Sequence, residues 1–251
     1  MSEVFLLSRA QMARISPYFP LSHGVPRVDD RRVISGIVYV IRGGLQWKDA
    51  PKSYGPHKTL YNRFVRWSRL GVFDRIFASL AGEVPKPQRI MIDSTHLKAH
   101  RTSASLLKKE GGSRCIGRTK GGLNSKLHAV TDGNGRPIVL LLTEGQMSDH
   151  TGAKLLYPAL PKANALIADK GYDSDEFRSA LRAKRIAACI PPKRNRRLPI
   201  PFNKVLYRQR HKIENMFGRL KDWRRISTRY DRCAHTFFSA ICIAATVIFW
   251  L

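Results

Sequence analysis

The chain has 251 residues, and its 45 lysines and arginines against 18 aspartates and glutamates leave a net charge of +27. A hydrophobic content of 43% is enough to build a core, so global disorder is excluded. A globular chain this basic is expected to bind nucleic acid; a membrane surface fits less well, because no basic amphipathic helix is evident. The four cysteines form no C-x-x-C pair, which argues against a zinc site or a disulfide framework.

Residues 1–82 are predicted to form a small helical region. Asp29–Asp30 are good helix-capping residues for a first helix, which Gly43–Gly44 would end. A second helix is expected over 57–70 and a short third one over 73–80.

Three helices with basic later members resemble a helix-turn-helix DNA-binding unit. Lys58, Arg63 and Arg66 of the second helix are the expected DNA contacts. The alternative is a helical bundle whose basic residues form only a solvated face.

Beyond a linker over 83–88 the pattern changes to α/β. Apolar runs predict strands over 89–94, 123–131, 137–143, 165–168 and 186–190. Helices are expected over 149–160, over 174–184 and around residue 214. The order predicts a mixed five-stranded sheet with flanking helices, in a domain over 89–232. Residues 233–251 are mostly apolar but short for a bilayer span, so a buried C-terminal core helix is expected.

Two carboxylates stand at the ends of predicted strands: Asp93 after the first and Asp169 after the fourth. The carboxyl ends of central strands lie close together, and Glu214 on the following helix can converge on them. Three such carboxylates need counter-charge, and oxygen ligands favour two Mg²⁺ ions, with Mn²⁺ able to substitute. Singly, each has another interpretation: Asp93 as a cap, Asp169 as a turn residue, and Glu214 as an ion-pair partner of Arg210.

Glu214 shares a helix face with three further polar residues. Tyr207, Arg210, Glu214 and Lys221 are separated by three, four and seven residues. At about 100° per residue, these steps place all four within roughly a 60° arc. One carboxylate flanked by two cations and a phenol suits metal and phosphate chemistry.

The spacing Y-x2-R-x3-E-x6-K over 207–221 matches the Y-R-E-K pattern of DDE transposases of insertion-sequence families four and five. The segments DSTHLKAHRT, IGRTKGGLNSKLHAVTD, LLLTEGQMSDH and ADKGYDSDEFR resemble family-five transposases in particular. Together with WKDAPKSYGPHKTLYNRFVRW near the N-terminus, they cover most of the chain.

This resemblance implies an RNase H-like catalytic core, two magnesium ions and cut-and-paste DNA strand transfer. By position, the DDE triad corresponds to Asp93, Asp169 and Glu214. The residues that contact the terminal phosphates correspond to Tyr207, Arg210 and Lys221. The short interval between Asp169 and Glu214 leaves no room for the inserted β-domain of some family-four members.

Further basic residues would complete the DNA path by gripping phosphates. Arg118 and Lys120 belong to a basic, glycine-rich stretch that is expected to order on DNA, although a solvated loop is the alternative. Arg196 and Arg197 precede the helix of Glu214.

The sequence therefore predicts a DNA transposase that cleaves at insertion-element ends and transfers the 3′-hydroxyl to target DNA. The alternatives are a related metal-dependent nuclease and a non-catalytic DNA-binding protein derived from a transposase. The expected partners are terminal inverted repeats and target DNA, with a homodimer in the DNA complex. Neither a membrane nor a small-molecule cofactor is expected, and the location is the bacterial cytoplasm at the nucleoid.

Overall fold

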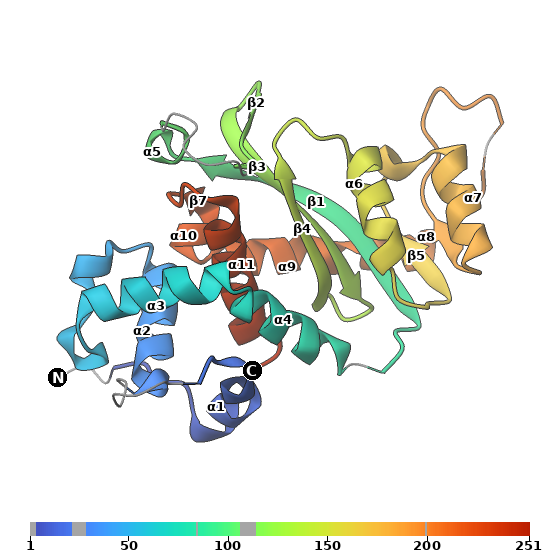
Figure 1. Cartoon of the computed structure of the whole chain (residues 1–251). Coiled ribbons are helices and arrows are strands. Elements are labelled where there is room, and N and C mark those ends of the chain that lie inside the picture. Colours follow the sequence, from blue (N-terminus) through green and yellow to red (C-terminus); the bar gives the residue numbers. More distant parts are fainter. Residues whose placement is uncertain (1–3, 22–28, 84, 106–113, 199) are drawn as a thin grey trace. The chain divides into compact units, whose positions relative to one another are not determined.

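The computed structural model describes residues 4–21, 29–83, 85–105, 114–198 and 200–251. The chain divides into two compact units (Figure 1). Unit 1 comprises Met1–Leu80, His100–Gly112 and Leu220–Leu251, and unit 2 comprises Ala81–Ala99 and Ser113–Arg219. Residues 106–113, which belong to the basic, glycine-rich stretch before Arg118, lie outside the described residues. The C-terminal helix groups with the N-terminal helices in unit 1, and so does the segment 220–232.

Unit 1 is helical. Its elements include α1 (Arg9–Ile15), α2 (Asp30–Gly43), α3 (His57–Arg69), most of α4 (Val72–Gly82), α5 (Arg101–Ala104), α10 (Arg224–Ser227), the short strand β7 (Thr228–Arg229) and α11 (Ala234–Phe249). Asp29 caps α2 through its side chain, and Gly44 ends that helix in the left-handed conformation, with φ of 65°. Helix α1 was not expected from apolar spacing, and a capping box between Ser8 and Gln11 begins it.

The connection between α2 and α3 differs from that of a helix-turn-helix unit. That motif joins its helices by three or four residues, whereas residues 44–56 separate α2 from α3 and contain the 3₁₀ turns η2 (Trp47–Asp49) and η3 (Lys52–Tyr54). Pro51 and Pro56 both have extended backbones. Proline also disfavours helix at the preceding residue, so this segment cannot form one continuous turn.

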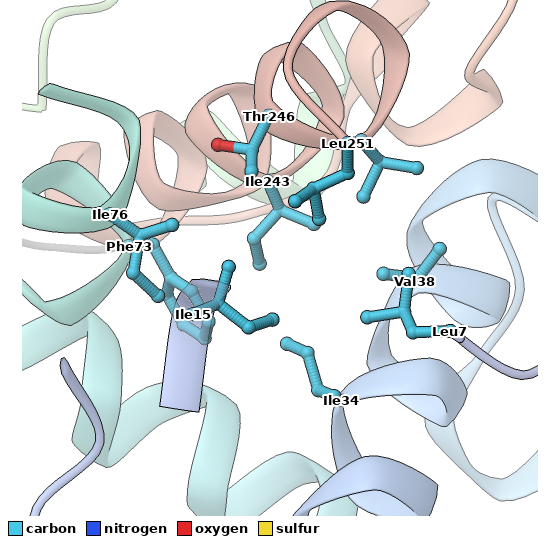
Figure 2. Close-up of a pocket in the computed structure, with 10 residues that line it drawn as sticks. Leu7, Ile15, Ile34, Val38, Phe73, Ile76, Ile243, Thr246 and Leu251 are labelled. Carbon is cyan, nitrogen blue, oxygen red and sulfur yellow. The ribbon is translucent and has the colours of Figure 1, made fainter. Parts of the chain in front are cut away.

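The core of unit 1 surrounds α11, which packs against α2 and α3. Phe237, Ala240, Ile241 and Cys242 of α11 are all inaccessible to solvent. Within the described part of the chain, no helix combines the length and apolarity needed to cross a membrane. Figure 2 shows a small apolar cavity of about 20 Å³ in this core, where Ile243 faces Ile34 and Ile15.

Replacing Ile243 by alanine is expected to lower the free energy of unfolding by about 3 kcal/mol, because the change enlarges an existing cavity. Urea unfolding followed by circular dichroism measures the effect. Val205→Ala is a suitable control, since that side chain is largely exposed. Equal losses in the two variants would contradict this account of the core.

Unit 2 is built on a mixed sheet. Its strands are β1 (Arg89–Ala99), β2 (Gly117–Thr119), β3 (Gly122–Asp132), β4 (Pro137–Glu144), β5 (Ala165–Ile167) and β6 (Ala187–Cys189). The order is β2-β3-β1-β5-β6, and β4 also pairs with β3. β1, β3 and β4 pair antiparallel, whereas β1, β5 and β6 pair parallel. The five expected strands and the mixed α/β class are confirmed; β2 is an additional three-residue strand.

One face of this sheet is covered by α6 (Asp149–Leu156) and α7 (Asp175–Ala183) (Figure 1). Ile90 and Ile92 of β1 pack there with Leu156 of α6 and Leu181 of α7. Successive side chains of a strand point to opposite faces. Asp93 therefore points away from α6 and α7.

The segment expected as one helix around Glu214 is interrupted. It consists of α8 (Lys204–Tyr207), the 3₁₀ turn η6 (Arg208–Arg210) and α9 (His211–Lys221). Nδ1 of His211 donates a hydrogen bond to the carbonyl oxygen of Arg208, 2.7 Å away, and so competes with the backbone for that acceptor. A 3₁₀ turn advances about 120° per residue, so the four polar residues do not share one α-helical face as calculated from their spacing.

Candidate active site

Asp93 lies in β1, and Asp169 follows the neighbouring parallel strand β5. β1 pairs with β5 in the register Arg89 to Ala165 and Met91 to Ile167. Asp93 lies two residues beyond this pairing in β1. Asp169 lies two residues beyond β5 and caps the 3₁₀ turn η5 (Lys170–Tyr172) through its side chain. Asp93 lies in the middle of β1, which extends to Ala99, so the expectation that Asp93 ends the first strand is wrong. The charge of Asp169 nevertheless raises the pKa of Asp93, so the two carboxylates lie close enough to interact.

Arg210 links Asp93 to Glu214. Its Nη1 donates to Oδ2 of Asp93 at 2.7 Å, and its Nη2 donates to Oε1 of Glu214 one helical turn along. The side chain of Asp93 is 15% exposed, whereas that of Glu214 is 50% exposed. Glu214 is therefore joined to the site through a shared cation and stays open to solvent.

Burial and neighbouring charges make the ionised form of Asp93 less stable than that of a free carboxylate. Burial raises the pKa of Asp93 to about 6; the Ser94 N–H and Arg210 oppose this rise, and the charges of Asp169 and Asp149 add to it. Burial alone would lower the pKa of Arg210, but Asp93 and Glu214 more than offset it and raise that pKa. The guanidinium of Arg210 does not neutralise all of the carboxylates around it. The site therefore favours the binding of further cations.

Two family models match the chain. Residues 84–250 match the family described as "Transposase DDE domain", and residues 7–77 match the one described as "Putative transposase of IS4/5 family". The chain belongs to the DDE transposase family.

Curated relatives of the transposase carry matching names. This chain is 34% identical over 131 residues to "Putative transposase for insertion sequence element IS6501" of Brucella ovis. The match covers 51% of this chain and 99% of the relative. The chain is also 31% identical over 157 residues to "Putative transposase for insertion sequence element IS402" of Burkholderia cepacia, covering 55% and 72%. The protein is therefore a DNA transposase, an enzyme that acts on DNA.

A solved structure supports the fold of the transposase. A piggyBac transposase in a synaptic complex with hairpin DNA aligns with a TM-score of 0.51 at 10% identity, covering 95% of this chain and 70% of that one. The shared architecture is the RNase H-like core, whose mixed sheet is described above.

The carboxylate oxygens of the candidate site are suitable ligands for a divalent metal ion. The family is generally dependent on divalent metals. Asp93, Asp169 and Glu214 offer only hard oxygen ligands, the type preferred by Mg²⁺ and Mn²⁺. Across the described residues, no three His, Cys, Asp or Glu side chains form a group close enough to hold a metal, and Arg210 lies between Asp93 and Glu214.

The two remaining residues of the Y-R-E-K pattern lie at either end of the segment around Glu214. The ring of Tyr207, in α8, meets that of Phe202 edge to face with centroids 5.5 Å apart. Lys221 is the last residue of α9, two turns beyond Glu214, and burial lowers its pKa. Both side chains are only partly exposed.

The outlying basic residues fall into two groups. Lys58 and Arg66 on α3, Arg118 on β2, Lys120 after β2, and Arg197 are exposed. Arg63 and Arg196 are instead held by intramolecular contacts. Arg63 pairs with Asp30 at 2.8 Å and lies over the ring of Trp67. Arg196 pairs with Asp173 at 2.6 Å.

Sequence reasoning missed a polar cluster beside the DDE residues. Asp149, the first residue of α6, accepts hydrogen bonds from Ser94 and Lys126. All three lie in segments that resemble the family, but the sequence indicates Asp149 only as the first residue of a helix. Their sequence separations are too large for spacing to reveal the pairing.

Gly171 lies where a side chain would disturb Asp169. A Cβ at this position would stand 2.8 Å from Oδ1 of Asp169 and 3.5 Å from Oδ2 of Asp149. Oδ1 of Asp169 also accepts a hydrogen bond from the Gly171 N–H at 2.7 Å. Any side chain at position 171 would therefore displace the Asp169 carboxylate.

Gly171→Ala is expected to reduce DNA nicking about tenfold to 100-fold, because the methyl group displaces the Asp169 carboxylate. A gel assay of a labelled element end with Mg²⁺ measures it. Gly218→Ala, where an added Cβ meets no atom within 4 Å, serves as the control and is expected to nick normally. An unimpaired Gly171→Ala enzyme would contradict the placement of Asp169.

Proposed function

We propose that this transposase cuts DNA at the ends of its element and joins the freed 3′-hydroxyl to target DNA. The observation that supports the proposal is that Asp93 interacts electrostatically with Asp169 and is joined to Glu214 through Arg210. These three carboxylates are the residues we assign to catalysis and to holding two Mg²⁺ ions, with Mn²⁺ able to substitute.

The chain's own residues have distinct roles in this reaction. Asp93, Asp169 and Glu214 would hold the metal ions, which would supply an activated oxygen nucleophile and stabilise the leaving oxygen. Arg210, already charged at the site, neutralises non-bridging phosphate oxygens, and Lys221 adds a second cation from the same helical segment. Tyr207 contacts the terminal nucleotide.

DNA would be held along the exposed basic residues. The phosphate contacts that we propose are Lys58, Arg66, Arg118, Lys120 and Arg197. Arg63 and Arg196 support the surface through their ion pairs with Asp30 and Asp173. Two element ends must be joined together, so we propose a homodimer in the DNA complex, working on bacterial DNA at the nucleoid.

A strand-transfer assay with the protein, its flanking element ends and a target plasmid tests this function. Joined products in Mg²⁺ or Mn²⁺ are expected. Nicks without joined products would favour a metal-dependent nuclease. Binding of end DNA without any nick would favour a non-catalytic DNA-binding protein, an alternative that no observation supports at present.

DNA affinity is expected to fall steeply with salt, because phosphate neutralisation releases counterions. Arg118→Ala and Lys120→Ala are each expected to lower the slope of log affinity against log salt by about one. Fluorescence anisotropy at several salt concentrations measures these slopes. Tyr61→Phe, an exposed uncharged change on α3, should leave the slope unaltered. An unchanged slope in both charge variants would remove these residues from the DNA path.

A further inference from the structure

The middle of strand β1 presents two neighbouring polar residues to opposite faces of the sheet. Asp93 faces Arg210, whereas the side chain of Ser94 faces α6. The Ser94 N–H donates to Oδ1 of Asp93 at 2.8 Å. Its hydroxyl donates to Oδ1 of Asp149 at 2.6 Å. Ser94 is thus hydrogen-bonded to a proposed catalytic carboxylate and to a second carboxylate outside the DDE set.

A buried lysine completes this arrangement. β3 pairs with β1 so that His128 lies opposite Ser94 and Lys126 lies opposite His96, which puts Lys126 on the same face as Ser94. Nζ of Lys126 is 2.9 Å from Oδ1 of Asp149 and donates to the Met147 carbonyl oxygen at 2.9 Å. The lysine side chain is only 8% exposed. A lysine this buried needs a counter-ion, and Asp149 supplies it.

The close approach of α6 to the sheet makes this pair possible. Gly152 lies one helical turn after Asp149 on the same side of α6. A Cβ at Gly152 would come within 2.3 Å of the His128 ring. Because glycine stands there, α6 can lie against β3 with Asp149 directly beside Lys126.

The second oxygen of Asp149 faces the loop that carries Asp169. An added Cβ on Gly171 would meet Oδ1 of Asp169 and Oδ2 of Asp149 together. Tyr172 is fully buried beside them. Burial raises the pKa of Tyr172, and the charges of Asp149, Asp93 and Asp169 raise it further. Asp149 therefore lies close to Ser94, which is bonded to Asp93, and to the loop that carries Asp169.

We propose that Asp149 is a positioning residue of the transposase: with Lys126 as its counter-ion and Ser94 as its link, it holds Asp93 and the Asp169 loop in their metal-binding arrangement. This inference rests on the proposed function of those two carboxylates. The competing explanation is that Asp149 only neutralises a buried lysine and contributes to stability alone.

Metal binding without turnover separates the two explanations. Mn²⁺ affinity is measured by electron paramagnetic resonance on the full chain without DNA, for the wild type and for Asp149→Asn. Loss of a residue that supports metal ligands typically costs about tenfold to 100-fold in metal affinity. We expect a loss of that size, with a parallel loss of nicking and unchanged DNA affinity. Asp149→Glu, which keeps the charge, is expected to recover part of both.

The double variant Lys126→Met/Asp149→Asn guards against a trivial folding defect. It removes both charges, so no buried lysine is left unpaired, and its melting temperature is expected to recover relative to Asp149→Asn. Its Mn²⁺ affinity is expected to stay low, because the link to Ser94 is still altered. Glu176→Gln is the matched control, since Glu176 forms an exposed ion pair with Lys154 in the same unit.

The outcomes are distinct. Wild-type Mn²⁺ affinity in Asp149→Asn, or its return in the double variant together with the melting temperature, would overturn the positioning role and leave the proposed function intact. Absence of Mn²⁺ binding and of nicking in the wild type would overturn the proposed function, and this inference with it. Weak Mn²⁺ binding in both variants, with normal binding in Glu176→Gln, supports the inference.

Discussion

Glu214→Gln is expected to lower the rate of DNA nicking by on the order of 10³-fold or more, while affinity for end DNA stays the same or rises slightly. Removal of one member of a catalytic set that acts as a unit typically has effects of this size or larger. Glutamine keeps the shape of the side chain and an oxygen that can accept from Arg210. It removes the negative charge that a divalent ion requires. Single-turnover nicking of a labelled element end in Mg²⁺ measures the change.

Because Glu214 is exposed, this test separates an effect on catalysis from an effect on folding. Its side chain is half exposed and contacts the site through Arg210, so the substitution is not expected to alter folding. Asp222→Asn, at an exposed carboxylate just after α9, is the matched control and should nick normally. If Glu214→Gln nicked DNA at the wild-type rate, the third carboxylate would have to be sought elsewhere, and Asp149 would be the first candidate.

Asp173→Asn is expected to lower the free energy of unfolding of the transposase by about 3–5 kcal/mol, the usual cost of leaving one member of a buried ion pair unpaired. Oδ1 of Asp173 accepts from Nε of Arg178 at 2.7 Å, and Oδ2 accepts from the Lys193 N–H at 2.8 Å. The Asp173 side chain is fully buried and that of Arg178 is nearly so. Urea denaturation at pH 7 measures the loss.

Asp175→Asn is the matched control for Asp173→Asn. Asp175 also pairs with Arg196, at 2.7 Å, but its side chain is 86% exposed. Exposed pairs contribute little to stability because water and salt screen them. A similar loss of stability in the two variants would contradict the view that burial of Asp173 and Arg178 makes the difference.

Acid should weaken the wild type more than the Asp173→Asn variant. Burial alone would raise the pKa of Asp173, but hydrogen bonds from Arg196, the Lys193 N–H and Arg178 lower it well below its usual range. A carboxyl whose pKa is lower in the folded state stabilises the protein above its unfolded pKa of about 4. That stabilisation is lost as pH falls below about 4 toward the folded pKa. Urea unfolding at pH 3 and pH 6 should therefore show a smaller acid-induced loss in the variant.

Local sequence patterns predict much of the secondary structure. The five expected strands are present because each is a short apolar run bounded by turn residues. The capping residue Asp29 and the left-handed Gly44 mark the ends of α2, as their chemistry predicts. The prediction of one continuous helix, which rested on residue spacing alone, is wrong. The ideal helix drawn through Tyr207 and Glu214 is interrupted at η6, where the His211 side chain binds a backbone carbonyl.

The candidate carboxylates could be chosen from the sequence, because the apolar runs before Asp93 and Asp169 and the helical pattern around Glu214 are encoded within a few residues of each. The partners that hold those carboxylates did not, because they come from distant segments: Arg210 reaches Asp93 across 117 residues, and Ser94 reaches Asp149 across 55. Charge counts likewise showed a basic protein that should bind DNA. Only tertiary packing decided that Arg196 is paired with the buried Asp173. Periodicity reports which face a residue occupies, whereas an ion pair depends on which faces meet, and that is decided when the sheet and its helices pack.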